Sequence, residues 1–477
     1  MWGERIYGRL PIALQNVAVS VQGGQFQAVR YLSASFRETA RLLERNEHLS
    51  LPALKEFQFA AIRELATHCF GNSPFYRRLW QSHGVHPDDI RTFSDIRRIP
   101  IVTKQDLRAR TEEFFTQKTR RGMTVVHTSG TTGSPVTVCF SKQDIGRRYA
   151  FLERCRRWAG VRIGQKRATF TGRSIIAPGQ SEAPFWRYNF PGRQLLFSSC
   201  HLLPANLPAY VAALEKFQPE IIDGYPSAIH IVADHILRRG SVQKVRPQAI
   251  LVSAETVFPH QRQAIEAAFQ TKLYNQYASS EGAPFVSECS QGRLHVHSDS
   301  GLIEILDAEG NPAPPGHVGQ MVVSSFTTRV VPLLRFAIGD TAIPSEAEDR
   351  CTCGLPFPTI DALVGRVDDV LCTPDRGFVG RLDTVFKGVP NSIVEAQIVQ
   401  TSRQTIVLRL VPDRSRYRPE HARQIVQQMR SRLGEVVAIQ VEEVRGIPRS
   451  ANGKMRSVVN LCGDLLPSDL QYGKLQI

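Results

Sequence analysis

The sequence predicts an α/β protein, with a large N-terminal domain of several subdomains that combine helices with mixed and parallel sheets, and a small α+β C-terminal domain. Helix-like and strand-like stretches alternate between residues 100 and 340, which is the pattern of strands joined by crossover helices. At 477 residues the chain exceeds what one hydrophobic core usually supports. From about residue 366 the order becomes strand, strand, helix, strand, typical of a small α+β unit. We therefore expect domains at residues 1–365 and 366–477.

The N-terminal region is expected to be mainly helical. Between residues 35 and 70, "RETARLLERN" and "LPALKEFQFAAIRELATHCF" space their apolar residues as two amphipathic helices do, and "GNSPFY" ends the second. The earlier segment "LPIALQNVAVSV" at 10–21 is apolar but interrupted by Gln15 and Asn16. It either packs on the protein body or rests on a membrane surface, and its short length favours packing.

The central and C-terminal regions supply the remaining elements. Helical spacing appears in "AYVAALEKFQ", "AIHIVADHILRRG" and "QRQAIEAAFQ", and short apolar runs in "AILVSA", "KLYNQYA" and "QMVVSSF" predict strands between them. In the small domain, "EAQIVQ", "QTIVLRLVP" and "AIQVEEV" predict strands, and "PEHARQIVQQMRSRLG" predicts a helix. We see no internal repeat and no low-complexity tract.

The charge balance favours an anionic small-molecule partner. The formal net charge is +15, and a positive field concentrates any anion. The arginines are scattered in short pairs such as Arg120-Arg121 and Arg156-Arg157, without the basic tract of a nucleic-acid module. We therefore expect no specific nucleic-acid partner. The oligomeric state cannot be read from the sequence, although a homodimer is compatible with it.

The sequence predicts a cytoplasmic protein with free thiols. No stretch reaches the roughly 18 uninterrupted apolar residues of a membrane helix, so we expect no transmembrane segment, and the first residues lead into no signal-peptide core. The nine cysteines are an odd number, and several lie in apolar helix-like or strand-like contexts, as Cys69 and Cys155 do. Disulfides are therefore not expected.

The stretch "VVHTSGTTGSPVTV" at 125–138 predicts an anion-binding turn between two strands. β-Branched runs at both ends indicate the strands, and glycines 130 and 133 allow backbone N–H groups to face one point. Hydroxyl donors surround that point: Thr128, Ser129, Thr131, Thr132 and Ser134. Because Gly133 is followed by Ser134 and Pro135, the turn is not a Walker loop. A hydroxyl-rich surface hairpin is the alternative.

Four further stretches follow in a fixed order: "QYASSEG" at 276–282, "RFAIGD" at 335–340, "GRVDD" at 365–369 and "PRSANGKMR" at 448–456. Together with the first turn they resemble the acyl-adenylate-forming (ANL) superfamily, which includes acyl- and aryl-CoA ligases, peptide-synthetase adenylation domains and luciferase. The segments "SPFYRRLW", "DIRTFSDIRRIPIVTKQDLR" and "TPDRGFVGRLDTVFKGV" resemble its phenylacetate-CoA ligase branch, particularly the CapK-like relatives. The resemblance spans residues 10–460 and is specific for adenylation, not for one acid.

This resemblance implies a nucleotide site. Six residues would wrap the ATP triphosphate: Thr128, Ser129, Gly130, Thr131, Thr132 and Gly133. Tyr277 and Ser280 would lie beside the nucleotide, and Glu281 would act in catalysis as the Mg²⁺ ligand, a task that suits a carboxylate. Asp340 would accept hydrogen bonds from both ribose hydroxyls. The alternatives are a helix-start carboxylate for Glu281 and a turn aspartate for Asp340.

The resemblance also implies a mobile C-terminal domain. Arg366, expected to bind the nucleotide, and Asp368 match the hinge on which this domain would pivot after adenylation. Lys454, from the small domain, would be the catalytic lysine that bridges the substrate carboxylate and the α-phosphate. A lysine suits this task because its point charge is carried on a flexible stem. An ordinary surface lysine is the alternative.

A second group of residues suggests a metal. Cys289 and His295 form a Cys-x₅-His pair, and Cys351 and Cys353 form a Cys-x-Cys pair about 60 residues later. Three thiolates and one imidazole make a closed tetrahedral Zn²⁺ site, and related ligases carry a similar arrangement. His297 competes with His295, because alternation along a strand puts both on one face. Structural zinc and free buried cysteines both remain open.

The sequence departs from the family pattern in three places. Ser134 stands where the phosphate loop usually carries a lysine, and Ala337 stands where an arginine is common. After the hinge, "VLCTPDRGFVG" replaces the usual glycine loop of the CoA tunnel. Either ATP is held more weakly or another basic group substitutes, and the loop change bears on the second half-reaction, the transfer to CoA.

The leading hypothesis is an acid-activating ligase that uses ATP and Mg²⁺ to adenylate a small aryl or short acyl carboxylic acid, and then transfers the acyl group to CoA. The acceptor could instead be an amine or a hydroxyl, as in an amide or ester ligase of polysaccharide or secondary-metabolite biosynthesis. In a nucleotidyl transferase, the AMP-linked product would be final. From another class, the chain could be an inactive nucleotide-binding scaffold, but the presence of Glu281, Asp340 and Lys454 argues against this.

Overall fold

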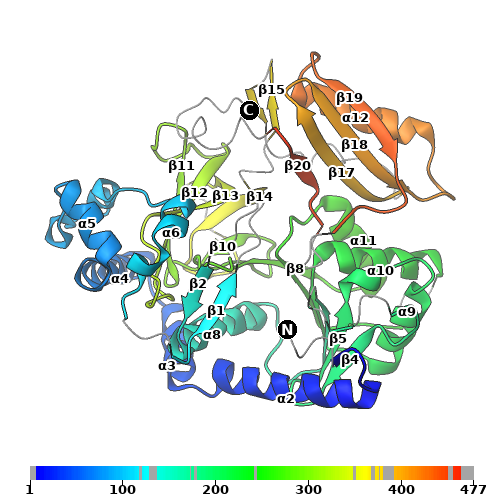
Figure 1. The fold of residues 1–477 in the computed structure, drawn as a ribbon, viewed down its shortest axis with the longest axis horizontal. Helices are drawn as coiled ribbons and strands as arrows, with labels where there is room; N and C mark the ends of the chain where they lie inside the picture. The colour runs from blue at the N-terminus through cyan, green and yellow to red at the C-terminus, as the bar shows by residue number, and fades with distance from the viewer. Residues whose placement is uncertain are drawn as a thin grey trace. The chain divides into compact units, whose positions relative to one another are not determined.

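Figure 1 shows the computed structural model of residues 1–477. The chain divides into two compact units. The first unit comprises residues 1–25, 159–275 and 364–477, and the second comprises residues 26–158 and 276–363. The structure describes residues 7–117, 121–127, 137–171, 173, 175–176, 180–240, 244–346, 351–366, 371–374, 377–379, 392–449 and 455–462. The combination of mixed sheets with surrounding helices confirms the predicted α/β class. The division into domains at residues 1–365 and 366–477 stays a prediction.

Helices dominate the N-terminal part of the second unit, as predicted. The two helices expected between residues 35 and 70 are α3 and α4, each capped by a serine: Ser33 Oγ accepts from Phe36 N at 3.2 Å and Ser50 Oγ from Ala53 N at 3.4 Å. The helices of this unit are α3 (Ala34–Asn46), α4 (Leu51–Asn72), α5 (Pro74–Ser82), η1 (Pro87–Asp89), η2 (Phe93–Arg98), α6 (Lys104–Ala109), α7 (Thr111–Phe114) and α8 (Lys142–Trp158).

The second unit also contains an antiparallel sheet and a hairpin. The sheet has the order β11-β12-β13-β14-β10-β9-β8. Its strands are β8 (Leu273–Tyr277), β9 (Val286–Glu288), β10 (Leu294–Val296), β11 (Gly301–Leu306), β12 (Gly319–Ser325), β13 (Phe336–Pro344) and β14 (Thr359–Arg366), and the chain passes between the units within β8 and β14. The hairpin pairs β1 (Thr124–His127) with β2 (Thr137–Phe140), as predicted for the ends of the first turn.

The first unit contains a mostly parallel sheet with the order β8-β7-β6-β3-β5-β4. Crossover helices join its strands, and the central strand β7 is an apolar run buried on both faces, as is typical of parallel sheets. The elements are β3 (Arg167–Thr171), β4 (Trp186–Asn189), β5 (Gln194–Ser198), η3 (Ser199–His201), α9 (Leu207–Phe217), β6 (Ile221–Gly224), α10 (Pro226–Arg238), β7 (Ala249–Ser253) and α11 (Pro259–Phe269). This confirms the predicted alternation.

Helix α2 (Ile12–Tyr31) contains the apolar N-terminal segment. In the first unit it packs beside β4, where Gln15 Oε1 accepts from Arg187 Nε at 2.6 Å and Asn16 Oδ1 from the Tyr188 N–H at 2.9 Å. These contacts agree with the packing on the protein body that the sequence favours for this segment. No helix within the described ranges is both long and apolar enough to cross a membrane.

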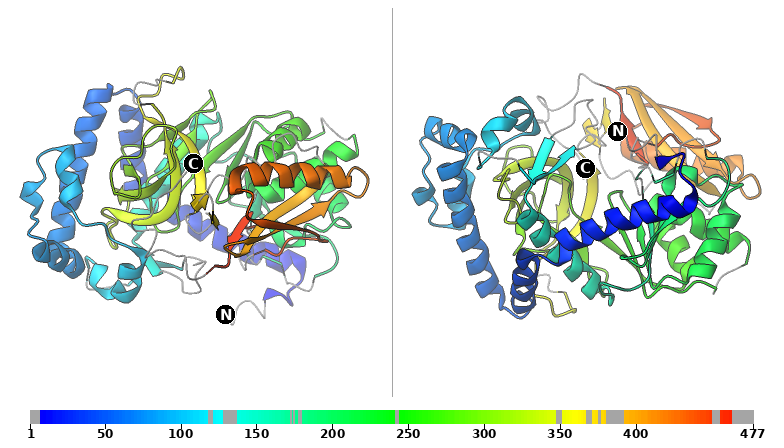
Figure 2. Two further views of the ribbon diagram at one scale, coloured as in Figure 1. Left: turned by 90° about the horizontal axis from the view of Figure 1, so that it is seen from above. Right: turned by 60° about the horizontal axis from the view of Figure 1, so that its bottom comes forward.

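The C-terminal part of the first unit is a four-stranded sheet with one helix on a face, shown in orange to red in Figure 2. Its strands follow the order β19-β18-β17-β20, and Ile398, Leu408 and Met429 contribute to the core beneath the helix. The elements are β17 (Ile393–Ser402), β18 (Thr405–Pro412), α12 (Pro419–Leu433), β19 (Ala438–Glu443) and β20 (Val458–Asn460), preceded by a hairpin of β15 (Leu371–Thr373) and β16 (Gly377–Val379). The three strands and the helix predicted for the small domain are all present.

Candidate active site

Glu281 is presented by a tight turn directly after β8. The Ser279 Oγ accepts hydrogen bonds from the N–H groups of Gly282 at 3.2 Å and Ala283 at 3.0 Å, which closes the turn. Gly282 has a φ of +107°, and a Cβ there would lie 2.4 Å from Thr328 Cγ2. Only glycine fits this position. The turn holds Glu281 at 5% exposure.

Lys104 is the side-chain partner of Glu281. The segment before it runs beside the start of β13, where the Val102 N–H donates to Arg335 O at 2.9 Å and the Ala337 N–H to Val102 O at 2.8 Å. Helix α6 then begins, capped by Thr103, and its first residue is Lys104. The Lys104 Nζ lies 3.0 Å from Glu281 Oε1, and both side chains are largely buried. Burial makes the pair mutually dependent, because either charge alone would lack compensation.

Tyr277 and Asp340 lie beside this ion pair. The Tyr277 hydroxyl donates to Asp340 Oδ2 at 2.6 Å. The preceding Gly339 has a φ of +76°, and the Lys104 Nζ lies 3.7 Å from where its Cβ would be. The Lys104 ammonium group therefore pairs with the glutamate turn and lies close to the strand that carries the aspartate. We call Lys104, Tyr277, Glu281 and Asp340 the carboxylate cluster.

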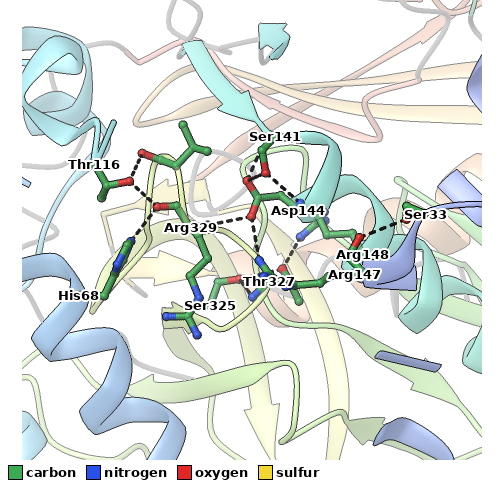
Figure 3. A network of polar contacts seen from close by, with 12 residues as sticks. Ser33, His68, Thr116, Ser141, Asp144, Arg147, Arg148, Ser325, Thr327 and Arg329 are labelled. Carbon is green, nitrogen blue, oxygen red and sulfur yellow. Dashed lines mark hydrogen bonds and ion pairs between the residues drawn. The ribbon is translucent and has the colours of Figure 1, made fainter. Parts of the chain in front are cut away.

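A polar network joins α8, the helix that follows β2, to Thr327 and Arg329 (Figure 3), and it also supports the glutamate turn. Arg148 donates from Nη2 to Ser279 O at 3.0 Å and from Nη1 to Thr327 Oγ1 at 3.2 Å. Burial lowers the pKa of Arg148 to about 10, so it stays charged at neutral pH. One turn earlier, the buried Asp144 accepts from Ser141 Oγ at 2.8 Å and from the Arg329 N–H at 3.0 Å. The network thus connects the segment that follows β2, just after the predicted phosphate loop, to the turn that carries Glu281.

The predicted nucleotide-site residues fall into two groups. Tyr277, Glu281 and Asp340 are brought together, and Ser280 lies exposed in the same turn. Arg366 is the last residue of β14. The other predicted residues lie outside the described residues: Thr128, Ser129, Gly130, Thr131, Thr132, Gly133, Asp368 and Lys454. Their roles stay predictions.

The predicted metal ligands also converge. The ligand atoms of Cys289, His295, Cys351 and Cys353 all lie within 4.8 Å of one another. Cys289 Sγ is 3.7 Å from Cys351 Sγ, and Cys353 Sγ is 3.3 Å from His295 Nε2. The other ring nitrogen of His295 lies 2.7 Å from Phe357 O, a contact that leaves Nε2 free to face the thiols. Burial lowers the pKa of His295, which favours its neutral, metal-binding form. We call these four residues the thiol cluster.

His297 lies outside the thiol cluster because β10 ends at Val296 and the chain then turns away from strand alternation. Its Nδ1 accepts from Arg154 Nη2 at 2.7 Å, and its Nε2 lies 2.6 Å from Ser287 Oγ. Burial and the Arg154 charge hold the pKa of His297 well below its usual value. Arg154 in turn pairs with Asp299 at 2.6 Å. The structure therefore groups His295, and not its competitor, with the three cysteines.

Lys104 and Arg148 were missed by the sequence reasoning. The "TKQD" box of Thr103 to Asp106 signals a helix start, and it was visible in the sequence. Its contact with Glu281 joins distant segments, and such a pairing cannot be read from one sequence. Arg148 carried no distinguishing signal among many arginines.

The fold defines the class of protein. A crystal structure of 2-hydroxyisobutyryl-CoA ligase in complex with 2-HIB-AMP superposes with a TM-score of 0.68 at 20% identity, covering 87% of this chain and 91% of that one. The chain thus has the fold of the adenylate-forming CoA ligases, as the resemblance implied.

The sequence comparisons identify the family. Protein CapK of Staphylococcus aureus is 32% identical over 457 residues, which cover 95% of this chain and 98% of that protein. The family model of the CapK C-terminal domain matches residues 371–461. The chain belongs to the CapK family, and the predicted branch is confirmed. A phenylacetate-coenzyme A ligase of Thermus thermophilus is 28% identical, covering 76% of this chain and 81% of that enzyme.

Proposed function

We propose that the protein is an acid-activating ligase, which converts a carboxylic acid and ATP to acyl-AMP and pyrophosphate and then transfers the acyl group to CoA with release of AMP. The observation that carries the proposal is the carboxylate cluster, in which Glu281, Lys104 and Asp340 come together beside the turn held by Arg148. A reaction between a carboxylate and ATP brings anions together, so its site needs positive charge and fixed acceptors. The similarity to phenylacetate-coenzyme A ligases supports the same reaction.

Each member of the carboxylate cluster has a distinct task in this proposal. Glu281 would hold Mg²⁺, which when bound neutralises phosphate charge. Asp340 offers two carboxylate oxygens to the ribose diol, and Tyr277 orients it through their hydrogen bond. Lys104 supplies a cation beside Glu281 and substitutes for the lysine that Ser134 replaces in the phosphate loop. Lys454, from the predicted C-terminal domain at 366–477, would contact the reacting carboxylate and α-phosphate.

We further propose that the thiol cluster holds a structural Zn²⁺. Thiolates about 2.3 Å from a tetrahedral zinc ion lie about 3.8 Å apart, and Cys289 and Cys351 meet this test with their sulfur atoms at 3.7 Å. Three thiols and a neutral imidazole are also the donors that zinc prefers. The ion would join the β9–β10 hairpin to the segment before β14.

The test is a product analysis of the purified protein. Incubation with ATP, Mg²⁺ and a panel of aryl and short-chain acids, phenylacetate first, should release pyrophosphate for at least one acid. Mass spectrometry with CoA present should then detect the acyl-CoA thioester of that acid. An acyl-AMP that persists with CoA but disappears with an amine or a sugar would reassign the acceptor. Tight AMP binding without pyrophosphate release from any acid would favour the inactive scaffold.

A further inference from the structure

A second glutamate, Glu255, occupies a site outside the carboxylate cluster and lies wholly in the first unit. It follows β7 through Ala254, whose φ of +71° is rare for a residue with a side chain. Its Oε2 accepts from the N–H of Ser227, in the first turn of α10, at 3.2 Å. Its Oε1 accepts from the N–H of Met455 at 2.8 Å. One carboxylate thus joins two distant backbone segments.

Arg449 makes a second connection between the start of α10 and the C-terminal part of the chain. Its Nη1 donates to Ser227 Oγ at 3.0 Å, and its Nη2 pairs with Glu395 of β17. Glu395 also accepts from the Ile447 N–H at 3.4 Å. The side chains of Arg449 and Glu395 are 15% and 10% exposed. Solvent therefore screens this ion pair only weakly. We call Glu255, Ser227, Arg449 and Glu395 the latch.

The two anchored backbone positions enclose one short stretch of sequence. Arg449 and Met455 pair with each other as an isolated antiparallel bridge. Lys454 is the residue directly before Met455 in the sequence. The described contacts therefore fix both ends of the stretch that carries the predicted catalytic lysine, one through Arg449 and the other through Met455.

We infer that Glu255 is a positioning residue for adenylation: by holding the Met455 N–H against the start of α10, it sets the place from which Lys454 reaches the reacting groups. The inference rests on the proposed function for the role of Lys454. A carboxylate suits the task because its two oxygens accept from two N–H groups at once. Burial also raises the pKa of Glu255, because the charged form is disfavoured away from water. Hydrogen bonds to such a group are stronger than in water.

The latch should serve only one of the two half-reactions. The family resemblance implies that the small domain pivots after adenylation, so contacts that hold it in one position cannot be needed equally for acyl transfer. A misplacement of about 1 Å can cost on the order of 100-fold in rate. Loss of the Glu255 carboxylate should therefore slow adenylation about 10- to 100-fold, and acyl transfer from preformed acyl-AMP should change less than about threefold.

The experiment compares Glu255→Ala and Glu255→Gln with a matched control, Glu266→Ala. Glu266 lies in α11 of the same unit and also accepts from a backbone N–H, that of Leu273 at 3.0 Å, but its hydrogen bonds to Arg262 and Leu273 are local in the sequence. Adenylation is measured as pyrophosphate release with phenylacetate, or with whichever acid is most active. Acyl transfer is measured as thioester formation from synthetic phenylacetyl-AMP and CoA. Hydrogen exchange of the Ser227 and Met455 amides is followed in parallel.

The expected result is slow adenylation in Glu255→Ala, a smaller loss in Glu255→Gln, near-normal acyl transfer in both, and faster exchange at the Ser227 and Met455 amides. The Glu266→Ala variant should retain the wild-type hydrogen-exchange rates at these two amides. Equal losses in both half-reactions, or unchanged adenylation, would overturn the inference. If Glu255→Ala does not fold, Glu255→Gln decides by the same criteria. If the wild-type protein activates no acid, the proposed function is wrong. If the hydrogen-exchange rates of the Ser227 and Met455 amides are unchanged in the variants, the proposed role of the latch is wrong.

Discussion

The two units each hold a glutamate in the turn that follows a strand, Glu281 after β8 and Glu255 after β7, and the two glutamates differ in what binds them. In the second unit, Glu281 faces the ammonium group of Lys104. In the first unit, Glu255 accepts from two backbone N–H groups. A lysine side chain can swing away and leave the carboxylate to a metal ion, whereas a backbone N–H moves only with its chain segment. The partner thus decides whether a buried carboxylate can exchange ligands or fixes a position.

The largest expected effect comes from removing Glu281, the carboxylate that we expect to exchange its lysine partner for a metal ion. Glu281→Ala should lower the rate of adenylation by about 10³-fold, because an electrostatic group aimed at the reacting centre is lost. Glu281→Asp should retain more activity than Glu281→Ala, and excess Mg²⁺ should further raise the activity of Glu281→Asp. Pyrophosphate release at several Mg²⁺ concentrations checks this. Activity of Glu281→Ala within tenfold of wild type would remove Glu281 from the site.

Removing the partner of Glu281 should have the next largest effect. Lys104→Ala should raise the KM for ATP and lower kcat/KM about 10- to 100-fold, since it removes a cation and leaves a buried carboxylate unpaired. Lys104→Arg should recover part of the loss because it keeps the charge. The matched control is Lys55→Ala, at an exposed position of α4 in the same unit. Equal kinetics in Lys104→Ala and Lys55→Ala would show that Lys104 has no nucleotide role.

The thiol cluster offers a contrast within the second unit, because its expected role is structural. Cys351→Ser should abolish bound zinc, measured by elemental analysis, and lower the Tm by several degrees as the metal-linked folding energy is lost. Cys200→Ser changes an exposed cysteine in the first unit and should keep the zinc content. A metal-free wild-type protein with the same Tm as the metal-loaded form would argue for free cysteines.

Two histidines, His230 and His260, line a small cavity with Ser227 and Glu395 of the latch, and they should make the first unit sensitive to acid. Burial lowers the pKa of His230 to about 4 and that of His260 to about 3. In the unfolded chain both titrate near 6.5, so below that pH the unfolded state binds more protons. The contribution of the two neutral histidines to the free energy of unfolding is present above pH 6.5 and is lost as the pH falls toward 4. The urea midpoint should fall over this range, and less steeply in His230→Gln.

The smallest expected effect concerns the hydrogen bond that orients Asp340. Tyr277→Phe removes the 2.6 Å contact but keeps the ring. Because one hydrogen bond contributes about 0.5–1.5 kcal/mol, the KM for ATP should rise roughly 2- to 10-fold with little change in kcat. Steady-state kinetics would check this, and a large fall in kcat would instead give Tyr277 a direct role in chemistry.

Much of the fold followed from the sequence, because periodicity and capping act locally. The serines that cap α3 and α4 and the apolar run of β7 could be predicted for this reason. The order of motifs also predicted that Tyr277, Glu281 and Asp340 would share one site. It could not reveal Lys104, whose position depends on the pairing of Val102 with the start of β13. Nor could it reveal Glu255 as a bridge between two segments.

The choice between His295 and His297 shows the same limit at one strand end. Both residues fit the ligand spacing, and strand alternation predicted one common face. The strand stops at Val296, so the two rings take different partners: the thiols for one and Arg154 for the other. A difference of one residue in the length of a strand therefore decides which imidazole can bind metal, and such boundaries are the least predictable feature of a sequence.

The most direct test of the central claim is a crystal structure with a stable mimic of the acyl-adenylate, 5′-O-[N-(phenylacetyl)sulfamoyl]adenosine. The account predicts that Asp340 accepts hydrogen bonds from both ribose hydroxyls and that Lys104 and Glu281 lie beside the group that replaces the phosphate. A mimic bound elsewhere, with the Lys104–Glu281 pair and the Tyr277–Asp340 hydrogen bond facing only solvent, would contradict it.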